Sequence, residues 1–243
     1  MNSTRIAMWS GPRNISTAMM RAFENRPDTD VWDEPMYGHY LSQTGIKHPG
    51  AAEVIADQGT DWQDIAIRCQ ANSPNNMPVF YQKHMTMHLL PNMSRTWLEG
   101  LTNCFLIRHP DQVVASYGAV RADLTLEDIG FVQQAKLFDC VVESSEKTTL
   151  IIDSRDFLLK PKQMLDLLCE SLDIPFYPEM LNWPAGQRDS DGVWGKHWYD
   201  SVWKSTGFAE YRGKSPKLSK KFQAIADAAL PHYQKLYEHR LVV

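Results

Sequence analysis

Side chains that could bind an anion gather in one stretch near the start of the chain. An apolar run over residues 6–9 precedes a turn over residues 10–14, in which Gly11 and Pro12 favour a tight change of direction. Asn14 is the expected N-cap of the helix that follows. The stretch also supplies a guanidinium and two hydroxyls, from Arg13, Ser16 and Thr17. Because the first N–H groups of a helix lack intrahelical partners, this pattern predicts a phosphate or sulfate site.

The same stretch is also compatible with an ordinary strand–turn–helix corner that carries a capping Asn and a surface Arg. A strict nucleotide-binding P-loop needs Gly-x4-Gly-Lys followed by Ser or Thr. This loop has no second Gly and no Lys, so it is not a strict P-loop. The loop alone leaves both interpretations open.

Short apolar runs alternate with helical patterns along the rest of the chain. Strands are predicted at residues 6–9, 31–33, 79–83, 104–107 and 150–152. Helices are predicted at residues 16–25, 51–58, 61–71, 110–120, 126–145, 162–172 and 218–240, the last with a kink at Pro231. This alternation predicts an α/β fold of three layers, with a central parallel sheet flanked by helices as in P-loop nucleotide hydrolases. We expect a single domain over residues 1–243, with residues 177–243 as a lid or acceptor-binding subregion.

Polar and mostly cationic side chains follow the predicted strands at their carboxyl ends. They are Arg13, Glu34, Lys83, His84, Arg108, Asp153 and Arg155. Ligands bind beyond the carboxyl ends of the strands in open parallel sheets. Cations at four of these ends therefore favour an anion-binding site.

Composition excludes several classes of partner. The formal net charge of −4 gives no basic field for nucleic acid, and no apolar run reaches the roughly eighteen residues that predict a membrane span. The four cysteines are far apart and predict neither a disulfide framework nor a metal site. A strand near the N-terminus leaves no room for a signal peptide, so we expect a cytoplasmic protein. The oligomeric state cannot be predicted, although a homodimer is compatible with the sequence.

Residues 105–117 form the most specific stretch in the chain. Arg108 follows a predicted strand, Pro110 comes two residues later, and Ser116 lies eight residues after Arg108 on the next helix. This pattern resembles the 3′-phosphate-binding segment of sulfotransferases that use 3′-phosphoadenosine 5′-phosphosulfate (PAPS). The resemblance implies that Arg108 and Ser116 bind the 3′-phosphate.

The opening loop is similar to the 5′-phosphosulfate loop of the same family, which reads Pro-Lys-Ser-Gly-Thr-Thr. Pro12 matches the Pro, and Arg13 stands where the family usually has Lys. Ser16 and Thr17 match the two hydroxyl positions, whereas Asn14 and Ile15 replace Ser-Gly. Arg remains charged and can bind sulfate through two donors. The resemblance implies donor contacts from Ser10, Gly11, Pro12, Arg13, Asn14, Ile15, Ser16, Thr17, Arg108 and Ser116.

The resemblance also implies the reaction. A hydroxyl or amine of a small-molecule or carbohydrate acceptor attacks the sulfur, and adenosine 3′,5′-bisphosphate (PAP) leaves without the help of a metal. Arg13 would act at the transferred group. Glu34 is a candidate base because several carbohydrate sulfotransferases carry a catalytic Glu after the second strand. A carboxylate paired with Arg13 or Arg108 is the structural alternative.

His84 is a second candidate base, because the cytosolic branch of the family has Lys-Thr-His at the end of the third strand. Here Lys83-His84 ends that strand, and the family His aligns with Met85, so His88 is a third candidate. A loop or helix-capping histidine is the structural alternative for His84. His84 and His88 also have the spacing of a helical metal pair, but no third ligand is evident.

The C-terminal part offers weaker candidates. The family has a basic, glycine-containing segment there that reaches the 3′-phosphate, for which the candidates are Lys196, His197 and Lys204. The Trp and Tyr side chains around them either pack a subdomain onto the sheet or line an acceptor cleft with Tyr37, His39 and Tyr40.

Two other functions fit part of the sequence. A P-loop kinase or nucleotide hydrolase would explain the opening loop, with Asp33 as a magnesium ligand, but not the Arg108–Ser116 pattern. A non-catalytic nucleotide or anion binder on the same fold would need no base.

Overall fold

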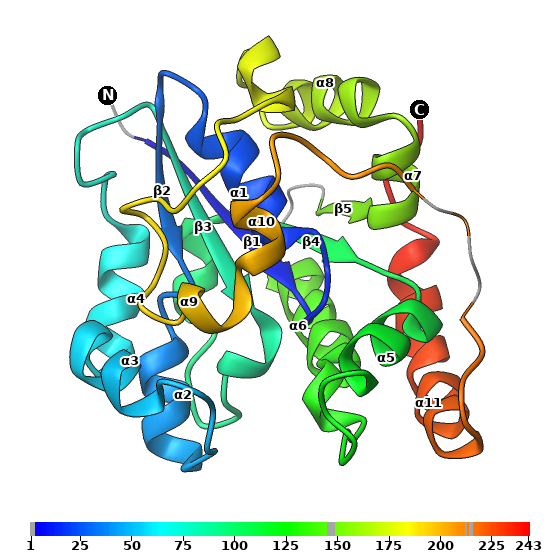
Figure 1. The fold of residues 1–243 in the computed structure, drawn as a ribbon. Coiled ribbons are helices and arrows are strands. Elements are labelled where there is room, and N and C mark those ends of the chain that lie inside the picture. Colours follow the sequence, from blue (N-terminus) through cyan, green and yellow to red (C-terminus); the bar gives the residue numbers. More distant parts are fainter. Residues whose placement is uncertain (1–2, 145–148, 212, 214–215) are drawn as a thin grey trace.

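The computed structural model describes residues 3–144, 149–211, 213 and 216–243. One five-stranded parallel sheet lies at its centre, in the order β2-β3-β1-β4-β5 (Figure 1). The strands are β1 (Thr4–Ser10), β2 (Thr29–Asp33), β3 (Val79–Met85), β4 (Thr102–Ile107) and β5 (Leu150–Asp153). This arrangement confirms the predicted α/β fold.

Helices cover both faces of the sheet. The α-helices are α1 (Ser16–Glu24), α2 (Tyr37–Thr44), α3 (Ala51–Gln58), α4 (Trp62–Gln70), α5 (Pro110–Gly118), α6 (Phe131–Ser144), α7 (Ser154–Leu159), α8 (Pro161–Ser171), α9 (Gly195–Trp198), α10 (Asp200–Trp203) and α11 (Lys220–Tyr237). Short 3-10 helices lie at η1 (Thr86–His88), η2 (Thr96–Gly100), η3 (Glu127–Ile129) and η4 (Pro178–Leu181).

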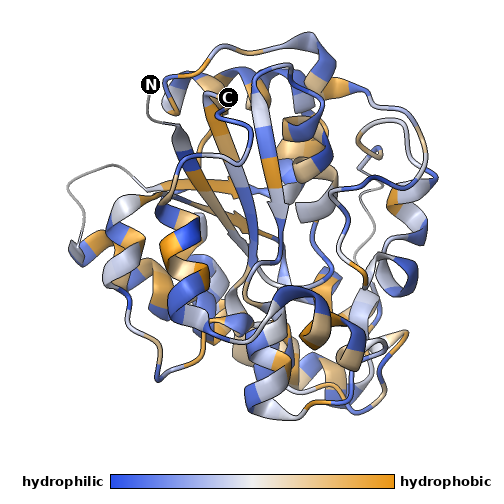
Figure 2. Ribbon diagram, turned by 90° about the vertical axis from the view of Figure 1, so that its left-hand side faces the viewer, coloured by the Kyte–Doolittle hydropathy of each residue, from blue (hydrophilic) through white to orange (hydrophobic). Residues whose placement is uncertain are grey.

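The side chains of β1 alternate between two hydrophobic layers. Ile6 and Met8 pack with residues of α1 and α8 on one face, whereas Ala7 and Trp9 pack with residues of α4, α5, α6 and α11 on the other. Hydrophobic residues accordingly concentrate on the strands and on the sides of the helices that meet them (Figure 2). Strands that are buried on both faces explain the continuous apolar runs in the sequence.

The register brings the carboxyl ends of the strands to one edge. Ser10 of β1 lies opposite Met85 of β3 and Leu106 of β4, and Asp33 of β2 lies opposite Lys83. Side chains that are far apart in the chain therefore emerge at the same edge, where the predicted site residues follow the strands.

Several local predictions need correction. Asn14 is not the N-cap of α1, because the helix begins one residue later than such a cap requires, with Ile15 at the N-cap position. The Asn14 Oδ1 accepts from the Ile15 N–H, and no side chain caps the helix. The predicted helix over residues 126–145 is interrupted at Gly130, whose φ of +72° separates η3 from α6; its predicted end at residue 145 lies outside the described residues. The sequence pattern does not predict helix α7, which Asp153 caps by accepting from the backbone N–H groups of Arg155 and Asp156.

Helix α11 continues through Pro231. Over the part of the chain that the structure describes, no helix combines the length and the apolar character needed to cross a bilayer.

Candidate functional site

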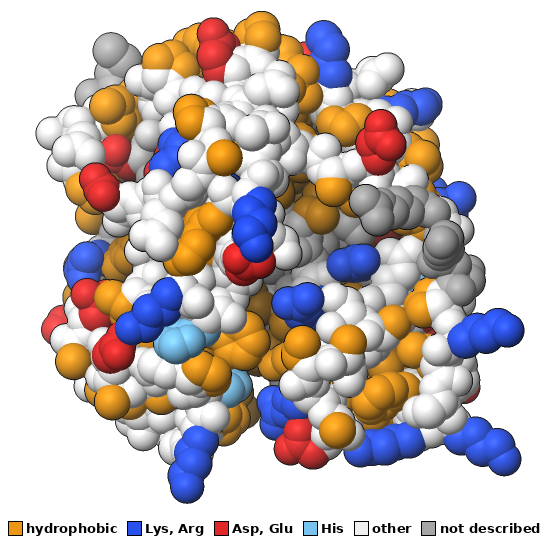
Figure 3. All heavy atoms as spheres, viewed as in Figure 1, with side chains coloured by type: hydrophobic (Ala, Val, Ile, Leu, Met, Phe, Trp, Pro, Cys, Tyr) orange, Lys and Arg blue, Asp and Glu red, His pale blue; other side chains and the backbone are white. Residues whose placement is uncertain are grey.

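A pocket of about 340 Å³ opens at the carboxyl edge of the sheet. The start of α1, the residues after β2 and β3, helix α5 and the stretch 194–209 all contribute to its lining. Figure 3 shows a hollow near the middle of this face, with hydrophobic, basic and acidic side chains at its rim. The pocket is thus assembled from all the strand ends that are polar in the sequence, except that of β5.

One end of the pocket is the N-terminus of α1. Ser16, Thr17 and Ala18 begin this helix and line the pocket, and no side chain caps their N–H groups. Uncapped N–H groups at the positive end of a helix dipole are a binding site for phosphate or sulfate. The site therefore fits an anion through its backbone alone.

Two arginines add positive charge at the same end. The Arg13 Nε donates to the Ser116 hydroxyl at 3.0 Å, and the Arg108 guanidinium donates to the Arg13 carbonyl. The two motifs that the sequence singled out are therefore in direct contact. Neither arginine forms an ion pair with a carboxylate of the described residues, and burial and the nearby Arg13 charge lower the pKa of Arg108. Two uncompensated cations in one pocket favour a ligand with more than one negative charge.

The other end of the pocket holds a buried acidic cluster around Lys83. The Lys83 Nζ donates to Asp33 Oδ1 at 2.8 Å, to the Tyr199 hydroxyl at 2.8 Å, and to Glu34 Oε1. The Tyr199 hydroxyl in turn donates to Asp33 Oδ2 at 2.7 Å. An ammonium group has three N–H donors, so all the donors of Lys83 are used within the cluster. Asp33 is only 3% exposed and Lys83 only 1%, so one buried cation faces two carboxylates.

The electrostatics of this cluster follow from burial. Burial raises the pKa of Asp33, although the Lys83 charge opposes this, and the two carboxylates hold the pKa of Lys83 well above its usual value despite its burial. Lys83 therefore stays charged and is bound to its neighbours rather than free to bind a ligand. Its role in this structure is to hold Glu34 and Asp33 in place.

Glu34 presents one carboxylate oxygen to the pocket. Its Oε1 accepts from Lys83, whereas Oε2 receives no hydrogen bond from a described residue and lies 3.9 Å from His88 Nδ1. The structural alternative that paired Glu34 with Arg13 or Arg108 is therefore wrong, because Lys83 is its cation. A carboxylate with one anchored and one available oxygen is suited to accept a proton.

Both Arg13 and Glu34 have backbone φ angles in the left-handed region, at +58° and +41°. This conformation costs a side-chain-bearing residue of order 1–3 kcal/mol. Asn76 and Asp173 also have positive φ angles, but of these four residues only Arg13 and Glu34 line the pocket. Strain of this kind is typical of functional sites.

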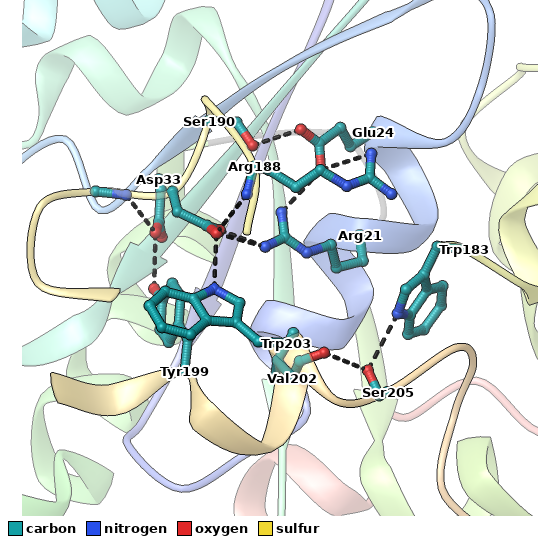
Figure 4. Close-up of polar contacts among 12 residues, drawn as sticks. Arg21, Glu24, Asp33, Trp183, Arg188, Ser190, Tyr199, Val202, Trp203 and Ser205 are labelled. Atoms are coloured by element: carbon teal, nitrogen blue, oxygen red, sulfur yellow. Dashed lines mark hydrogen bonds and ion pairs between the residues drawn. The ribbon is translucent and has the colours of Figure 1, made fainter. Parts of the chain in front are cut away.

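The stretch 183–209, whose last part forms a wall of the pocket, is anchored by buried polar contacts (Figure 4). Arg21 of α1 donates to both carboxylate oxygens of Asp191, at 2.5 and 2.7 Å, and Trp203 Nε1 donates to the same carboxylate at 2.9 Å. Tyr199 ties the turn between α9 and α10 to the Lys83 cluster. The wall is thus held by charged partners on α1 and on β3.

The sequence-predicted residues Pro12, Arg13, Asn14, Ile15, Ser16, Thr17, Glu34, Arg108 and Ser116 all line the pocket. The structure brings them together at one site, although they come from four separate segments. Among the candidate bases, His88 also lines the pocket.

His84 does not line the pocket. Successive residues of a strand face opposite sides, so Lys83 faces the site while His84 is buried in the core. Its ring stacks on Trp9 with centroids 4.3 Å apart, and burial lowers its pKa to about 3. A neutral ring packed in the core is not placed to take a proton from an acceptor, which argues against the prediction that His84 is the base.

Other predicted contacts also lie away from the pocket lining. Ser10 is fully buried, and Gly11 packs so closely on the Ile129 carbonyl that a Cβ would lie 2.7 Å from this oxygen. Lys204 is exposed and pairs with Asp200 one turn earlier. Among the weaker candidates, Lys196 pairs with Glu53.

The sequence does not predict that Lys83, Asp33 and Tyr199 form one cluster. Lys83 and Glu34 stand out in the sequence as polar strand ends, but nothing local shows that they pair. Tyr199 comes from a stretch far along the chain, where a run of aromatic residues is the only signal. Within the described residues, no group of three or more His, Cys, Asp or Glu side chains could hold a metal ion.

Comparison with known proteins agrees with this geometry. A family model described as "Sulfotransferase domain" matches residues 4–240. Among solved structures, a sulfotransferase from Alicyclobacillus acidocaldarius has a TM-score of 0.59 at 10% identity and covers 100% of this chain and 98% of that one. Mouse sulfotransferase SULT7A1 complexed with PAP has a TM-score of 0.51 at 11% identity, with 98% and 89% coverage. At these identities, the structural likeness supports the fold.

Two curated relatives from Arabidopsis thaliana match over nearly the whole chain. They are branched-chain-amino-acid aminotransferase-like proteins 1 and 2, at 29% and 27% identity over 234 residues, or 96% of this chain. The chain spans about two fifths of the length of these relatives, at 42% and 41%. With the family model matched over all five strands and the pocket, the chain belongs to the sulfotransferase domain family.

Proposed function

We propose that this protein transfers a sulfuryl group from PAPS to a hydroxyl or amine of a small-molecule or carbohydrate acceptor. The observation that carries the proposal is the direct contact between the two anion-binding motifs. Arg108 donates to the Arg13 carbonyl, and Arg13 donates to Ser116, beside the uncapped start of α1. A ligand with phosphates at both ends of one nucleoside matches two uncompensated guanidinium groups and a helix N-terminus in one pocket.

Each end of the donor has a group of residues suited to it. The N–H groups of residues 16–18 and the Arg13 guanidinium would hold the 5′-phosphosulfate, and Arg108 with Ser116 would hold the 3′-phosphate. Leu158 and Phe208 line the same pocket and offer apolar surface to the purine. Mouse SULT7A1, which shares this fold, is complexed with PAP in its crystal structure, and this supports a donor of the same nucleotide class here.

The chemistry follows from the opposite end of the pocket. The acceptor oxygen or nitrogen forms a bond to sulfur, and the bond between sulfur and the bridging phosphate oxygen breaks. PAP leaves with that electron pair, and Glu34 Oε2 takes the acceptor proton. Arg13 and the helix N-terminus stabilise the negative charge on the transferring group and the leaving phosphate.

The alternative of a P-loop kinase or nucleotide hydrolase has less support. Such an enzyme would need Asp33 for magnesium, but both Asp33 oxygens accept hydrogen bonds from Lys83 and Tyr199 in a fully buried cluster. A carboxylate in that position is not available to a metal ion.

Isothermal titration calorimetry distinguishes these functions. We expect PAP to bind without magnesium, and ATP with magnesium to bind at least tenfold more weakly, because ATP lacks the 3′-phosphate. Incubation with ³⁵S-labelled PAPS and a panel of phenols, alcohols, amines and sugars then tests transfer. Tight binding of magnesium–ATP with no measurable PAP binding would refute the proposal. PAP binding without transfer to any acceptor, or to water, would favour the non-catalytic binder.

A further inference from the structure

We infer that the acceptor's nucleophilic atom is held between two side chains, Glu34 Oε2 and His88 Nδ1, and that His88 is an acceptor-binding residue of this enzyme. The inference rests on the proposed sulfuryl transfer and names the part of the site that receives the acceptor. It assigns the position of the reacting atom to the gap that separates these two side chains.

The His88 side chain is a buried polar group without a partner. It is 3% exposed, lines the pocket, and its Nδ1 forms no hydrogen bond with any described residue. A buried, unpaired nitrogen destabilises the protein unless a ligand or water satisfies it. Because the His88 side chain lines the pocket, a ligand atom that enters beside Glu34 is the partner that this nitrogen lacks.

The orientation of this ring is fixed by its neighbours. His88 stacks on Tyr37 with centroids 4.6 Å apart and planes within 4°, and on Tyr40 with centroids 4.7 Å apart. Tyr37 is itself held by a hydrogen bond between its hydroxyl and His48 Nδ1 at 2.9 Å. The imidazole is thus clamped in one plane, which keeps Nδ1 directed toward Glu34.

The second side chain of the gap is equally constrained. Lys83 holds Glu34 Oε1, so the carboxylate has one free oxygen, Oε2, and this oxygen lies 3.9 Å from His88 Nδ1. That distance is too long for a direct hydrogen bond. An oxygen or nitrogen atom about 2.8 Å from each of them would bridge the two groups, with small adjustments of the Glu34 side chain.

The two side chains would have different roles. Glu34 accepts the proton that the nucleophile loses. His88 stays neutral, because burial and the charge of Lys83 hold its pKa well below the usual value, so it orients the nucleophile by a hydrogen bond rather than by taking the proton. Lys83 has no free donor, so it contributes to this site through Glu34.

Two substitutions separate hydrogen bonding from packing. His88→Phe keeps a ring that can stack on Tyr37 and Tyr40 but removes Nδ1. His88→Asn loses the ring but keeps an amide group near the position of Nδ1. A purely structural role predicts that Phe is the better replacement, whereas the inference predicts that Asn is better for activity and Phe for thermal stability.

The readouts are PAP affinity by calorimetry, melting temperature, and the rate of PAP release from PAPS. That rate is measured with water as the acceptor and with added 4-nitrophenol. We expect His88→Phe to lower kcat/KM for turnover by ten- to a hundredfold, with a PAP Kd within twofold of the parent. His88→Asn should retain at least three times the activity of His88→Phe despite a lower melting temperature.

Three results would overturn the inference. The first is full activity in His88→Phe. The second is a loss of PAP affinity in His88→Phe that is as large as its loss of turnover. The third is a His88→Asn variant that is no more active than His88→Phe. The first and third leave the proposed function intact, because the parent still binds PAP and consumes PAPS. Absence of PAP binding by the parent would instead refute the proposed function, and the inference with it.

Discussion

The two ends of the pocket use positive charge in opposite ways. At one end, Arg13 and Arg108 have no carboxylate partner among the described residues, and their guanidinium groups contact only a hydroxyl, a carbonyl and an amide side chain. At the other end, Lys83 is surrounded by Asp33, Glu34 and Tyr199, and all its donors are used. The first arrangement leaves charge available to an anion, and the second fixes the geometry of a carboxylate.

This contrast shows why a count of cations at strand ends is an incomplete guide to a site. All three cations line one pocket, but only the uncompensated ones can contribute net attraction to a phosphate or sulfate. A cation that is buried with more than one carboxylate has its charge cancelled by these neighbours and cannot attract a further anion. Substitutions at each end of the pocket test this division.

Glu34→Gln is expected to lower PAPS turnover by roughly 10²–10⁴-fold, because it removes the base while preserving the shape of the side chain. PAP affinity should change less than twofold. Since the variant also relieves the excess of carboxylates over Lys83, its melting temperature should equal or exceed that of the parent. Turnover assays, calorimetry and thermal unfolding of the same samples test this. Retention of more than a tenth of the activity would show that another group takes the proton.

Lys83→Met is expected to destabilise the fold by about 3–5 kcal/mol, because it leaves a fully buried Asp33 without its cation. The free energy of unfolding in urea measures the effect, with Lys204→Met as the exposed control. The double variant Asp33→Asn/Lys83→Met should regain part of the loss. If the double variant is as unstable as the sum of the two single variants, the charges of Asp33 and Lys83 are not coupled as described.

Stability is expected to fall as the pH drops below about 6.5. Burial lowers the pKa of His84 to about 3 and that of His88 well below its usual value, so both are neutral when folded. These histidines leave the free energy of unfolding at its full value above pH 6.5, which is about the pKa of histidine in the unfolded chain. The free energy of unfolding then falls as the pH drops toward their pKa values in the folded protein. Each histidine should lower the free energy of unfolding by roughly 1.4 kcal/mol for each pH unit in this range.

Urea unfolding at pH 7, 5.5 and 4.5 measures this loss. His84→Phe, which keeps a ring against Trp9, should show a shallower dependence on pH, whereas the exposed-site control His197→Ala should follow the parent. An unchanged slope in His84→Phe would mean that this histidine is already protonated or accessible in the folded protein.

Arg108→Ala is expected to weaken PAP binding by about ten- to a hundredfold, which corresponds to the loss of charged hydrogen bonds to a phosphate. Arg121→Ala is the matched control, because Arg121 pairs with Asp123 and Asp128 and does not line the pocket. Calorimetry with PAP measures both. Equal PAP affinity in the parent and in Arg108→Ala would show that the nucleotide does not bind at Arg108.

Lys204→Ala is expected to change neither PAP affinity nor turnover by more than twofold. The side chain is about 74% exposed and forms a surface pair with Asp200, so its effect on stability should stay below about 0.5 kcal/mol. Steady-state kinetics measures the turnover of this variant, and calorimetry measures its PAP affinity, each against the parent. A marked loss of PAP affinity would mean that the stretch 194–209 moves onto the donor when it binds.

The sheet and the end of the pocket around Arg13 and Arg108 were predictable because their signals are local. Apolar runs followed by polar strand ends define the parallel sheet, and the spacing between Arg108 and Ser116 is contained in one strand–helix unit. The contact of these residues with Arg13 then follows from the adjacency of β1 and β4.

The end of the pocket around Lys83 was less predictable because its contacts are not local. Lys83 meets Asp33 only through the register of β2 against β3, and Tyr199 reaches them from a turn more than a hundred residues later. The position of His84 was unpredictable for a related reason. The sequence does not show which of two adjacent strand residues faces the site, and here Lys83 takes that position while His84 faces the core.

The stretch 194–209 has a thermodynamic consequence for the proposed function, because its residues line the pocket over a long span. Trp194 and Trp198 belong to the end near Glu34, whereas Phe208 packs on Phe157 next to β5, on the far side of the sheet order. A ligand that orders this wall at one end alters the free energy of binding at the other, and thermodynamic linkage makes the effect reciprocal. If donor and acceptor bind as proposed, each is therefore expected to change the affinity for the other by the same factor.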